Sequence, residues 1–431
     1  MEVPRKLCQK VKIKTIHFVT LDLKKVFSDA FLIPNKPVIM DDNKKGLNTI
    51  CTHFGEIQDE QFKGAVSPLF MSTSYAFEDV DVKRYPRYFN TPNQVALSKK
   101  IAALEHAEAA MIFGSGMAAI STALMAFLKA GDHIVLQNSL YGGTYNLVTE
   151  EFEKFGIEYS FTTGLQPADF EAKIKENTKV IYIETPSNPL LTITDLEAVA
   201  QIAKKHGLVS MIDNTFASPV NQNPIDFGID VVLHSATKYM GGHSDILAGA
   251  VVSSQEHMER IFHLAKNFGG SLSDYTVWLL ERSIKTMGIR VRAQNENAMM
   301  MARYLFGHKD IQAVYYPGLE SHPGHELAKA QMKGFGGMLS FELNKNLNSS
   351  TFQKSLHLIK SSMSLAGVES TVLSPTLTSH SLLTAEEREK QGIADGLIRF
   401  SVGIEEVEDL IADIEQAIES VKATTTTLHS N

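Results

Sequence analysis

Residues 230–249 read D-V-V-L-H-S-A-T-K-Y-M-G-G-H-S-D-I-L-A-G, and this stretch indicates both the fold and the site. Its apolar run, Val231-Val232-Leu233, predicts a short buried strand that ends at small hydroxyl residues, a lysine and a glycine pair. Open α/β sheets bind their ligands at the carboxyl ends of such strands. We therefore expect Ser235, Thr237 and Lys238 to lie at a ligand-binding edge.

A lysine at the end of a strand, flanked by hydroxyls that can hold a phosphate, suits an imine with pyridoxal phosphate. A lysine in this position is also compatible with an ordinary solvated side chain, and the stretch alone leaves both interpretations open. The remainder of the chain has to decide between them.

Composition and charge exclude several classes of protein. A length of 431 residues predicts two domains, and 44% hydrophobic with 21% charged residues is typical of a chain with a large core. A net charge of −8 argues against binding to nucleic acid or to an anionic membrane. The two cysteines, Cys8 and Cys51, form no C-x-x-C pair, which predicts no zinc site, no disulfide framework and a cytoplasmic location. No apolar run approaches the roughly 20 residues that span a bilayer.

The first 45 residues differ from the rest, since ten lysines and arginines stand there against five acidic residues. Lysines interrupt every apolar run, so the segment has no signal-peptide core. We expect residues 1–45 to be a flexible extension and residues 46–94 to be an N-terminal arm.

Strands alternate with helices from residue 95 to about 295, which predicts a large α/β domain with a mainly parallel sheet and right-handed crossovers. We expect strands at 110–113, 133–137, 179–184, 208–213, 231–233 and 250–253, and helices at 97–104, 117–128 and 195–206. A long helix at 273–306 contains the boundary, near 295, to a smaller α+β domain over 296–422. That domain has expected strands at 338–343 and 397–402 and helices at 351–360 and 406–421. Residues 423–431 read as a disordered polar tail.

Two further motifs fit the same ligand. Asp213 ends the run V-S-M-I-D, where its carboxylate can pair with the pyridine nitrogen of the cofactor and keep it protonated. Gly116 and Met117 begin a helix after Gly114-Ser115, and free N–H groups there can hold a phosphate. A capping or turn aspartate and a simple tight turn are the alternatives. The motif is not G-x-S-x-G, which argues against a serine hydrolase.

Other candidates have a structural alternative of equal or greater weight. Tyr141, in L-Y-G-G-T-Y, can stack on a flat ring and transfer a proton, or can be a buried structural tyrosine. Arg399 lies on an apolar strand, where it can hold a substrate carboxylate with both guanidinium nitrogens or form an internal salt bridge. Tyr85 and Arg87 lie in a loop, and surface placement is the simpler interpretation. S-H-P-G-H at residues 321–325 predicts a loop and no metal site.

Together these segments resemble the Cys/Met-metabolism, or transsulfuration, family of pyridoxal-phosphate enzymes. The resemblance covers residues 52–420, and its motifs occur in the order of the family. They are Y-P-R-Y, S-G-M-A, Y-G-G-T, D-N-T-F, S-A-T-K-Y with G-H-S-D, and G-V-E-S followed by L-I-R-F-S-V-G. It implies a fold-type-I enzyme, with a large domain around a mainly parallel sheet, a smaller C-terminal α+β domain, and a homotetramer built as a dimer of dimers.

The resemblance also implies a role for each matching residue. Lys238 would form the imine, Asp213 would pair with the pyridine nitrogen, and Tyr141 would stack on the ring. Gly116, Met117, Ser235 and Thr237 would hold the phosphate, whereas Tyr85 and Arg87 would reach the phosphate of a neighbouring subunit. The α-carboxylate of an amino-acid substrate would be oriented by Asn188, Ser370 and Arg399.

The implied chemistry is γ-elimination or γ-replacement on cystathionine or O-acylhomoserine-type amino acids. The freed Lys238 amine would remove the α-proton, and Tyr141 or Lys238 would serve as acid and base. Glu369 in G-V-E-S, together with G-H-S-D, resembles the cystathionine γ-synthase and γ-lyase branch. Asn146 stands where that branch has arginine, as in the O-acetylhomoserine sulfhydrylase, and Gly143 replaces the cysteine of methionine γ-lyase. Those two enzymes, an aminotransferase and a catalytically silent binding protein remain alternatives.

Overall fold

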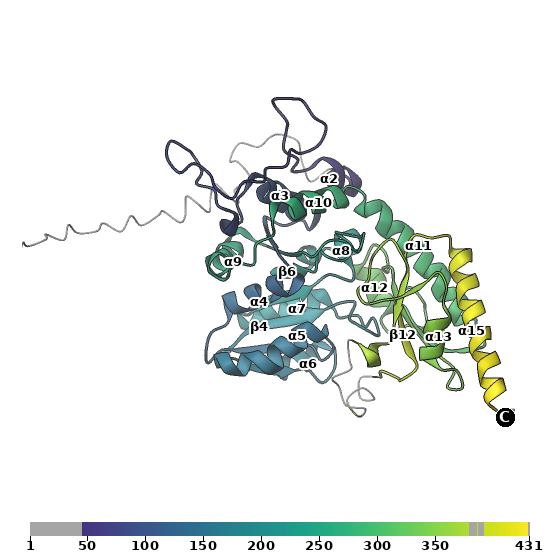
Figure 1. The fold of residues 1–431 in the computed structure, drawn as a ribbon. Coiled ribbons are helices and arrows are strands. Elements are labelled where there is room, and N and C mark those ends of the chain that lie inside the picture. The colour runs from purple at the N-terminus through teal and green to yellow at the C-terminus, as the bar shows by residue number, and fades with distance from the viewer. Residues whose placement is uncertain (1–44, 379–385, 387–391, 430–431) are drawn as a thin grey trace, which may run out of the picture.

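The structure is a computed structural model that describes residues 45–378, 386 and 392–429 of the chain (Figure 1). All but the last residue of the predicted N-terminal extension, 1–45, therefore lies outside the described residues. Two sheets, each with its own helices, make up the body of the molecule. The active-site candidates are distributed between them.

The larger sheet has seven strands in the order β1-β7-β6-β5-β4-β2-β3. Strands β2 to β6 run parallel, and only β7 runs antiparallel to its two neighbours, β1 and β6. This arrangement confirms the predicted mainly parallel sheet. Its strands are β1 (Ala109–Phe113), β2 (His133–Leu136), β3 (Glu158–Phe161), β4 (Thr178–Glu184), β5 (Val209–Asp213), β6 (Val231–His234) and β7 (Gly249–Ser253).

Both faces of this sheet are covered, because successive side chains of its strands enter two different hydrophobic cores. Ile112, for example, packs in the core that contains Leu97 and Val199, whereas Met111 packs with Leu124 and Phe262. The first core is formed with α3 (Pro92–Leu104) and α7 (Leu196–His206), and the second with α4 (Gly116–Phe127) and α9 (Gln255–Phe268).

The helices next to the sheet begin at residues that satisfy their free N–H groups. The Thr91 hydroxyl accepts the N–H of Gln94, and the Gln94 side chain accepts the N–H of Thr91, which forms a capping box before α3. The Asp195 carboxylate caps α7 by accepting the N–H of Ala198, and Gly207, at φ +65°, ends it in the left-handed conformation. Local sequence therefore determines where these helices start and stop. Shorter helices are α2 (Leu47–His53), α5 (Gly142–Asn146), α6 (Pro167–Glu171) and α8 (Ser218–Asn221).

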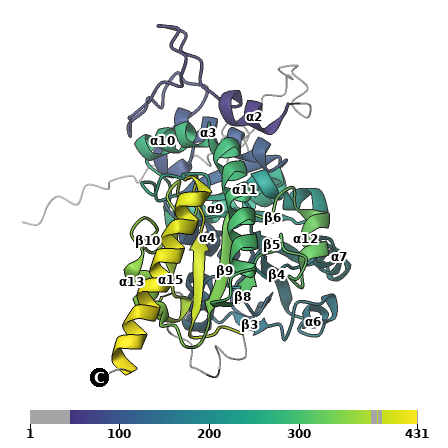
Figure 2. The ribbon, with the colours of Figure 1, turned by 90° about the vertical axis from the view of Figure 1, so that its right-hand side faces the viewer.

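The smaller sheet has five strands in the order β10-β11-β12-β9-β8 and is antiparallel apart from the β10–β11 pair. Helices α11 (Met287–Phe306) and α15 pack against β9 and β12 in one core (Figure 2). The strands are β8 (Ile311–Tyr315), β9 (Met338–Leu343), β10 (Lys360–Ser361), β11 (Thr371–Leu373) and β12 (Leu397–Ser401), and the helices are α12 (His325–Gln331), α13 (Ser349–Ser355) and α15 (Val407–His429).

The single long helix expected at 273–306 is two helices, α10 (Asp274–Ile284) and α11 (Met287–Phe306). The break falls at Thr286, whose hydroxyl donates to the Ser283 carbonyl and so competes with the helical backbone bonds. The first half of α11 packs in a core of the large sheet through Met287 and Val291, and the second half packs in the core of the small sheet.

Two other boundaries in the C-terminal part differ from expectation. The helix expected at 351–360 ends at Ser355, because the N–H groups of residues 357–359 donate to the Asp413 carboxylate instead. Helix α15 continues to His429, past the expected end at 421, so most of the expected disordered tail is helical. Threonine lowers helix propensity without breaking a helix, which explains the error. Among the helices of the described ranges, none has both the length and the apolar character needed to cross a bilayer.

Candidate active site

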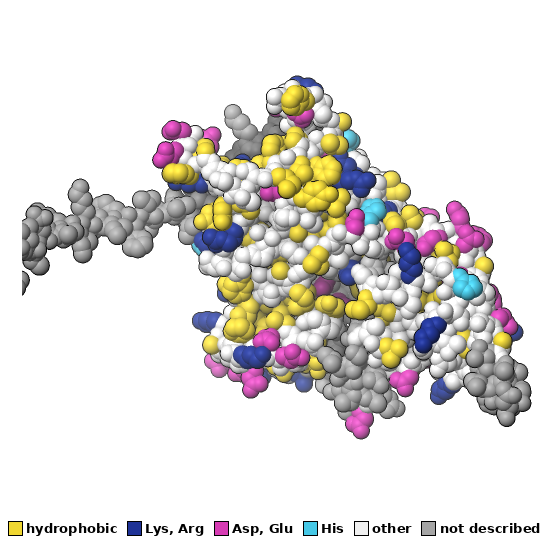
Figure 3. All heavy atoms as spheres, in the orientation of Figure 1, with side chains coloured by type: hydrophobic (Ala, Val, Ile, Leu, Met, Phe, Trp, Pro, Cys, Tyr) yellow, Lys and Arg dark blue, Asp and Glu magenta, His cyan; other side chains and the backbone are white. Residues whose placement is uncertain are grey.

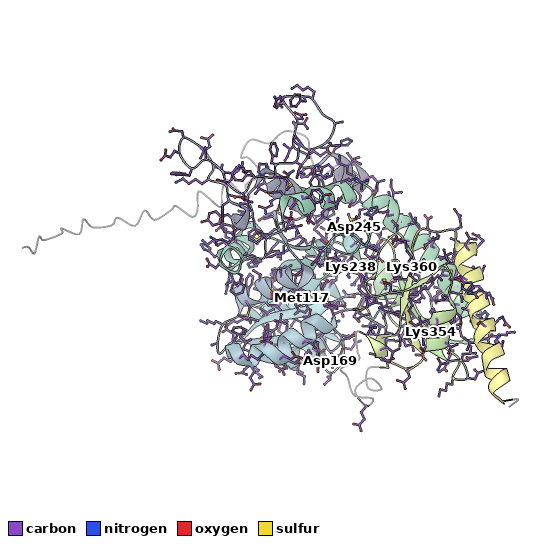
Figure 4. The ribbon with its side chains drawn as sticks, viewed as in Figure 1. Met117, Asp169, Lys238, Asp245, Lys354 and Lys360 are labelled. Carbon is purple, nitrogen blue, oxygen red and sulfur yellow. The ribbon has the colours of Figure 1, made fainter. Side chains whose placement is uncertain are left out.

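A cavity of about 610 Å³ lies at the carboxyl ends of the parallel strands and reaches across to β12 of the smaller sheet. Met117, at the start of α4, and Lys238, after β6, lie together at the centre of the molecule (Figure 4). The structure brings most of the predicted residues to this one cavity, as expected for an open α/β sheet. They are Gly116, Met117, Tyr141, Asn188, Asp213, Ser235, Thr237, Lys238 and Arg399.

Lys238 occupies the first turn after β6, where its N–H donates to the Ser235 carbonyl. Its Nζ lies 2.8 Å from the Ser364 hydroxyl. Burial and the nearby Arg399 cation lower the pKa of Lys238 from 10.5 to about 8, and Asp213 opposes this shift. A substantial fraction of the ε-amine is therefore neutral near physiological pH, which is the form that attacks a carbonyl carbon.

Asp213 ends β5, and its carboxylate is buried with only 6% of the residue exposed. One oxygen accepts the N–H of Thr215 at 3.0 Å. Burial raises the pKa of Asp213, while Thr215, His234 and Lys238 act in the opposite direction. A buried carboxylate of this kind gains most from a cationic partner, such as a protonated ring nitrogen.

The loop before α4 approaches Ser235 so closely that a side chain at Gly116 would not fit. A Cβ on Gly116 would lie 2.9 Å from the Ser235 Cβ, so only glycine permits this approach. Ser115 caps α4 by accepting the N–H of Ala118, and the first N–H groups of the helix face the cavity end. An anion is favoured at such a helix terminus, with the Ser235 side chain beside it. These features fit a phosphate group.

Arg399 lies on β12, in the smaller sheet, and is almost fully buried. One Nη donates to the Asn188 Oδ1 at 3.1 Å and the other to the Ser364 carbonyl at 2.9 Å. Burial lowers its pKa to about 10, and Glu184 opposes this shift. Within the described part of the chain, no carboxylate lies at ion-pair distance from Arg399, so the internal salt bridge considered from the sequence is not formed there. The guanidinium is available for an acidic ligand.

Tyr141 lies at the mouth of the cavity with 47% of the residue exposed. Its position is set by its backbone, because its N–H donates to Glu184 Oε2 at 2.8 Å. A half-exposed ring at a cavity wall is consistent with stacking on a ligand and not with the alternative of a buried structural tyrosine.

Ser370, predicted to orient the substrate, lies apart from the cavity residues. Ser370 is fully buried and lies outside the cavity wall, where its hydroxyl donates to Glu405 and accepts the N–H of Gly403. Ser364, six residues earlier, contacts both Lys238 and Arg399 instead. Spacing along an irregular loop does not indicate which hydroxyl faces the cavity, so the predicted role of Ser370 stays a prediction.

Three other predicted residues do not line this cavity. Glu369 is half exposed and lies 3.9 Å from Lys360. Tyr85 precedes a single turn at Pro86–Tyr88, and Arg87 lies within it. The Arg87 guanidinium lies over the rings of Tyr85 and Tyr88 and donates to the Lys266 carbonyl. The predicted contact of Tyr85 and Arg87 with a neighbouring subunit therefore stays a prediction.

Glu184 is a cavity residue that the sequence analysis missed. It ends β4 and is paired in register with Asp213 at the end of β5. The signal was present, since a polar residue at the end of a predicted apolar strand is what singled out Asp213. Burial and the neighbouring Asp213 raise the pKa of Glu184.

A lysine of lowered pKa, a buried aspartate and an anion cradle meet at the carboxyl edge of a mainly parallel sheet. With a second, smaller sheet that contributes an arginine, this arrangement defines a pyridoxal-phosphate enzyme of fold type I.

Comparison with known proteins agrees with this class. Residues 48–419 match the family model described as Cys/Met metabolism PLP-dependent enzyme. The cystathionine gamma-lyase of Bacillus subtilis is 45% identical over 377 residues, which cover 86% of this chain and 99% of that protein. The cystathionine beta-lyase of Lactococcus lactis subsp. cremoris is 43% identical over 369 residues, covering 85% and 97%.

A solved structure is also similar over most of the chain. The cystathionine gamma-lyase of Lactobacillus plantarum, in complex with L-serine, has a TM-score of 0.84 and 40% sequence identity, and the match covers 88% of this chain and 100% of that one. This chain belongs to the Cys/Met-metabolism family of pyridoxal-phosphate-dependent enzymes.

The lowered pKa of Lys238 predicts how cofactor uptake depends on pH. Only the neutral amine reacts with the cofactor aldehyde, so the rate of uptake by the apoenzyme should rise about tenfold per pH unit below pH 8 and level off above it. Stopped-flow absorbance with added pyridoxal phosphate measures this rate. A solvated lysine would give a rate still rising at pH 10, and that result would contradict the prediction.

Proposed function

We propose that the protein catalyses γ-elimination or γ-replacement on sulfur amino acids or their precursors, of the cystathionine or O-acylhomoserine type. The observation that carries this proposal is the placement of Lys238, Asp213 and Arg399 around one cavity. Bound pyridoxal phosphate supplies an electron-accepting ring and an aldehyde that holds an amino group. The residues of this chain supply orientation and proton transfer.

Binding of the substrate acid is assigned to Arg399, with Asn188 and Ser364 fixing the guanidinium. A carboxylate held by both nitrogens of Arg399 fixes the rotation of the amino acid. The α-hydrogen can then face the ε-amine of Lys238, which removes it as a general base. The proximity of Lys238 and Arg399 is supported by their shared partner, because Lys238 donates to the Ser364 hydroxyl and Arg399 to the Ser364 carbonyl.

Asp213 is assigned the task of holding a proton at the pyridine nitrogen, and Gly116, Met117, Ser235 and Thr237 the task of holding the phosphate. The Thr237 hydroxyl is bonded to both backbone groups of Ala248, so this side chain is already oriented. The Tyr141 phenol, at the cavity mouth, would protonate the group that leaves the γ-carbon.

Several substrates and reactions of this family are compatible with the cavity. The similar proteins include both a gamma-lyase and a beta-lyase of cystathionine. Asn146 lines the cavity, where it offers an amide to the distal part of a substrate. An O-acetylhomoserine sulfhydrylase, a methionine γ-lyase and, less favoured, an aminotransferase are the alternatives.

A panel of L-cystathionine, L-methionine, L-cysteine, and O-acetyl- and O-succinylhomoserine with cysteine or sulfide tests the proposal. Products should be separated by chromatography, because 2-oxobutyrate indicates γ-elimination, pyruvate indicates β-elimination, and a new thioether indicates replacement. We expect 2-oxobutyrate or a γ-thioether from at least one substrate. Amino transfer to a ketoacid without loss of any side-chain group would contradict the proposal.

We also propose a homotetramer in the cytoplasm, built from dimers whose subunits share active sites. Loops of the arm at 46–94 project from the body (Figures 1 and 2), and the arm exposes large apolar side chains, among them Phe62, Met71 and Phe77. Hydrophobic side chains also gather over α3 and α10, where Tyr275 is 56% exposed (Figure 3). Such surfaces favour association. Light scattering of the purified protein gives its mass, and a monomer would contradict this part.

The domain division is proposed at residues 95–295 for the cofactor-binding domain and 296–422 for the C-terminal domain. The change of core along α11, between Val291 and Ala298, supports the boundary near 295.

A further inference from the structure

We infer that Glu184 is a positioning residue that couples the cofactor ring to the substrate acid by tethering two loops with one carboxylate. The inference rests on the roles proposed above for Tyr141, Asn188 and Arg399. No chemical step has been assigned to Glu184 itself, although it is one of the most deeply buried carboxylates of the cavity, with 4% of the residue exposed.

The two oxygens of Glu184 accept hydrogen bonds from two different loops. Oε2 accepts the N–H of Tyr141 at 2.8 Å, and Oε1 accepts the N–H of Asn188 at 3.2 Å. The loop after β2 presents the ring that faces the cofactor, while the loop after β4 presents the amide that holds Arg399. One side chain at the end of β4 therefore determines where both loops lie.

The surroundings of Glu184 explain why a carboxyl group is needed there. An amide has a single acceptor oxygen, and its NH₂ group would face one of the two N–H donors. Leaving either donor buried and unpaired is costly in a site of low polarity. Burial and the neighbouring Asp213 raise the pKa of Glu184 to about 8, and the two N–H bonds and the Arg399 cation limit this rise.

The main chain of β4 reinforces the arrangement. The Gln137 side chain donates from Nε2 to the carbonyls of Glu184 and Ser139, which lie in the same two segments. Hydrogen bonds therefore hold both the backbone and the side chain of Glu184. Its carboxylate can in turn hold the loops after β2 and after β4 in place.

A matched control is available elsewhere in the chain. Asp413 is also a buried carboxylate that accepts backbone N–H groups, those of His357, Leu358 and Ile359, and it does not line the cavity. Asp413→Asn therefore removes a comparable tether from a part of the protein without a proposed role in binding.

The experiment compares Glu184→Gln with Asp413→Asn in two binding assays. The first titrates apoenzyme with pyridoxal phosphate and follows visible absorbance. The second titrates holoenzyme with glycine, an amino acid without a γ-group. Loss of one tether should weaken both affinities on the order of tenfold in Glu184→Gln. Asp413→Asn should leave both unchanged, at a similar melting temperature.

The Asn188→Ala background separates positioning from general destabilisation. If Glu184 acts through Asn188, then Glu184→Gln should weaken glycine binding much less in that background, while its effect on the cofactor persists. Unchanged affinities in Glu184→Gln, or an equal effect on glycine in both backgrounds, would overturn the inference. Glu184→Asp, which keeps two oxygens but shortens their reach, replaces Glu184→Gln if the amide variant does not fold. Neither assay requires turnover, so failure of the proposed reaction is seen separately in the substrate panel.

Discussion

Replacement of Lys238 by alanine is expected to abolish turnover, with a fall in kcat of at least about 10⁴-fold. The variant loses both the amine that holds the cofactor and the base that moves the α-proton. The visible absorbance of the bound cofactor should change or disappear as well, because that absorbance depends on the bond to the amine.

The matched control is Lys354→Ala, which removes an exposed lysine of α13 far from the cavity (Figure 4). It should retain wild-type absorbance and rate. Circular dichroism should show both variants folded, since the side chain of Lys238 donates a hydrogen bond to a single partner among the described residues, the Ser364 hydroxyl. Substantial turnover by Lys238→Ala, with the cofactor spectrum unchanged, would contradict the assignment of this residue.

The second large effect is expected at Arg399. Arg399→Ala should lower kcat/KM by about 10²- to 10³-fold, because the buried guanidinium proposed to bind the substrate acid through charge-assisted hydrogen bonds is lost. Arg399→Lys keeps the charge without the fork of donors and should recover only part of the activity.

The loss at Arg399 can be attributed to the α-carboxylate by changing the substrate. With the α-carboxamide of the same amino acid, wild type and Arg399→Ala should react at similar low rates, since the amide offers no anion to the guanidinium. An equal fold-loss for acid and amide would show that Arg399 acts by supporting the fold and not by binding the acid. Melting temperatures of the two variants complete the comparison.

Much of the large domain could be predicted because its strands are short apolar runs with a polar residue at the carboxyl end. Strands β5 and β6 follow this rule, and it places Asp213 and Lys238 at one edge of the sheet. Strand β3 was missed, since Glu158–Phe161 is an edge strand of mixed exposure without a clear apolar run. Helix α9 was also missed, although Met258, Ile261, Phe262 and Ala265 repeat at helical spacing.

The part of the site contributed by loops was harder to predict. Strand ends are ordered by the sheet, so residue type and position suffice there, for Glu184 as for Asp213. Ser364 has a left-handed backbone, at φ +79°, in a loop between two strands, and its contact with Lys238 spans 126 positions. Such a contact depends on how two sheets dock, which no local pattern of the chain encodes.

Because the two sheets dock to form the site, both are needed for binding the cofactor and the substrate together. The groups proposed to bind the cofactor belong to the larger sheet and its loops. The guanidinium proposed to bind the substrate acid belongs to β12 of the smaller sheet. A fragment that contains only the larger sheet would retain the Lys238 amine, which can react with the cofactor aldehyde. It would lack Arg399, the residue proposed to bind the substrate acid. If these assignments hold, mutations that loosen the contact between the two sheets should weaken substrate selectivity before they weaken cofactor binding.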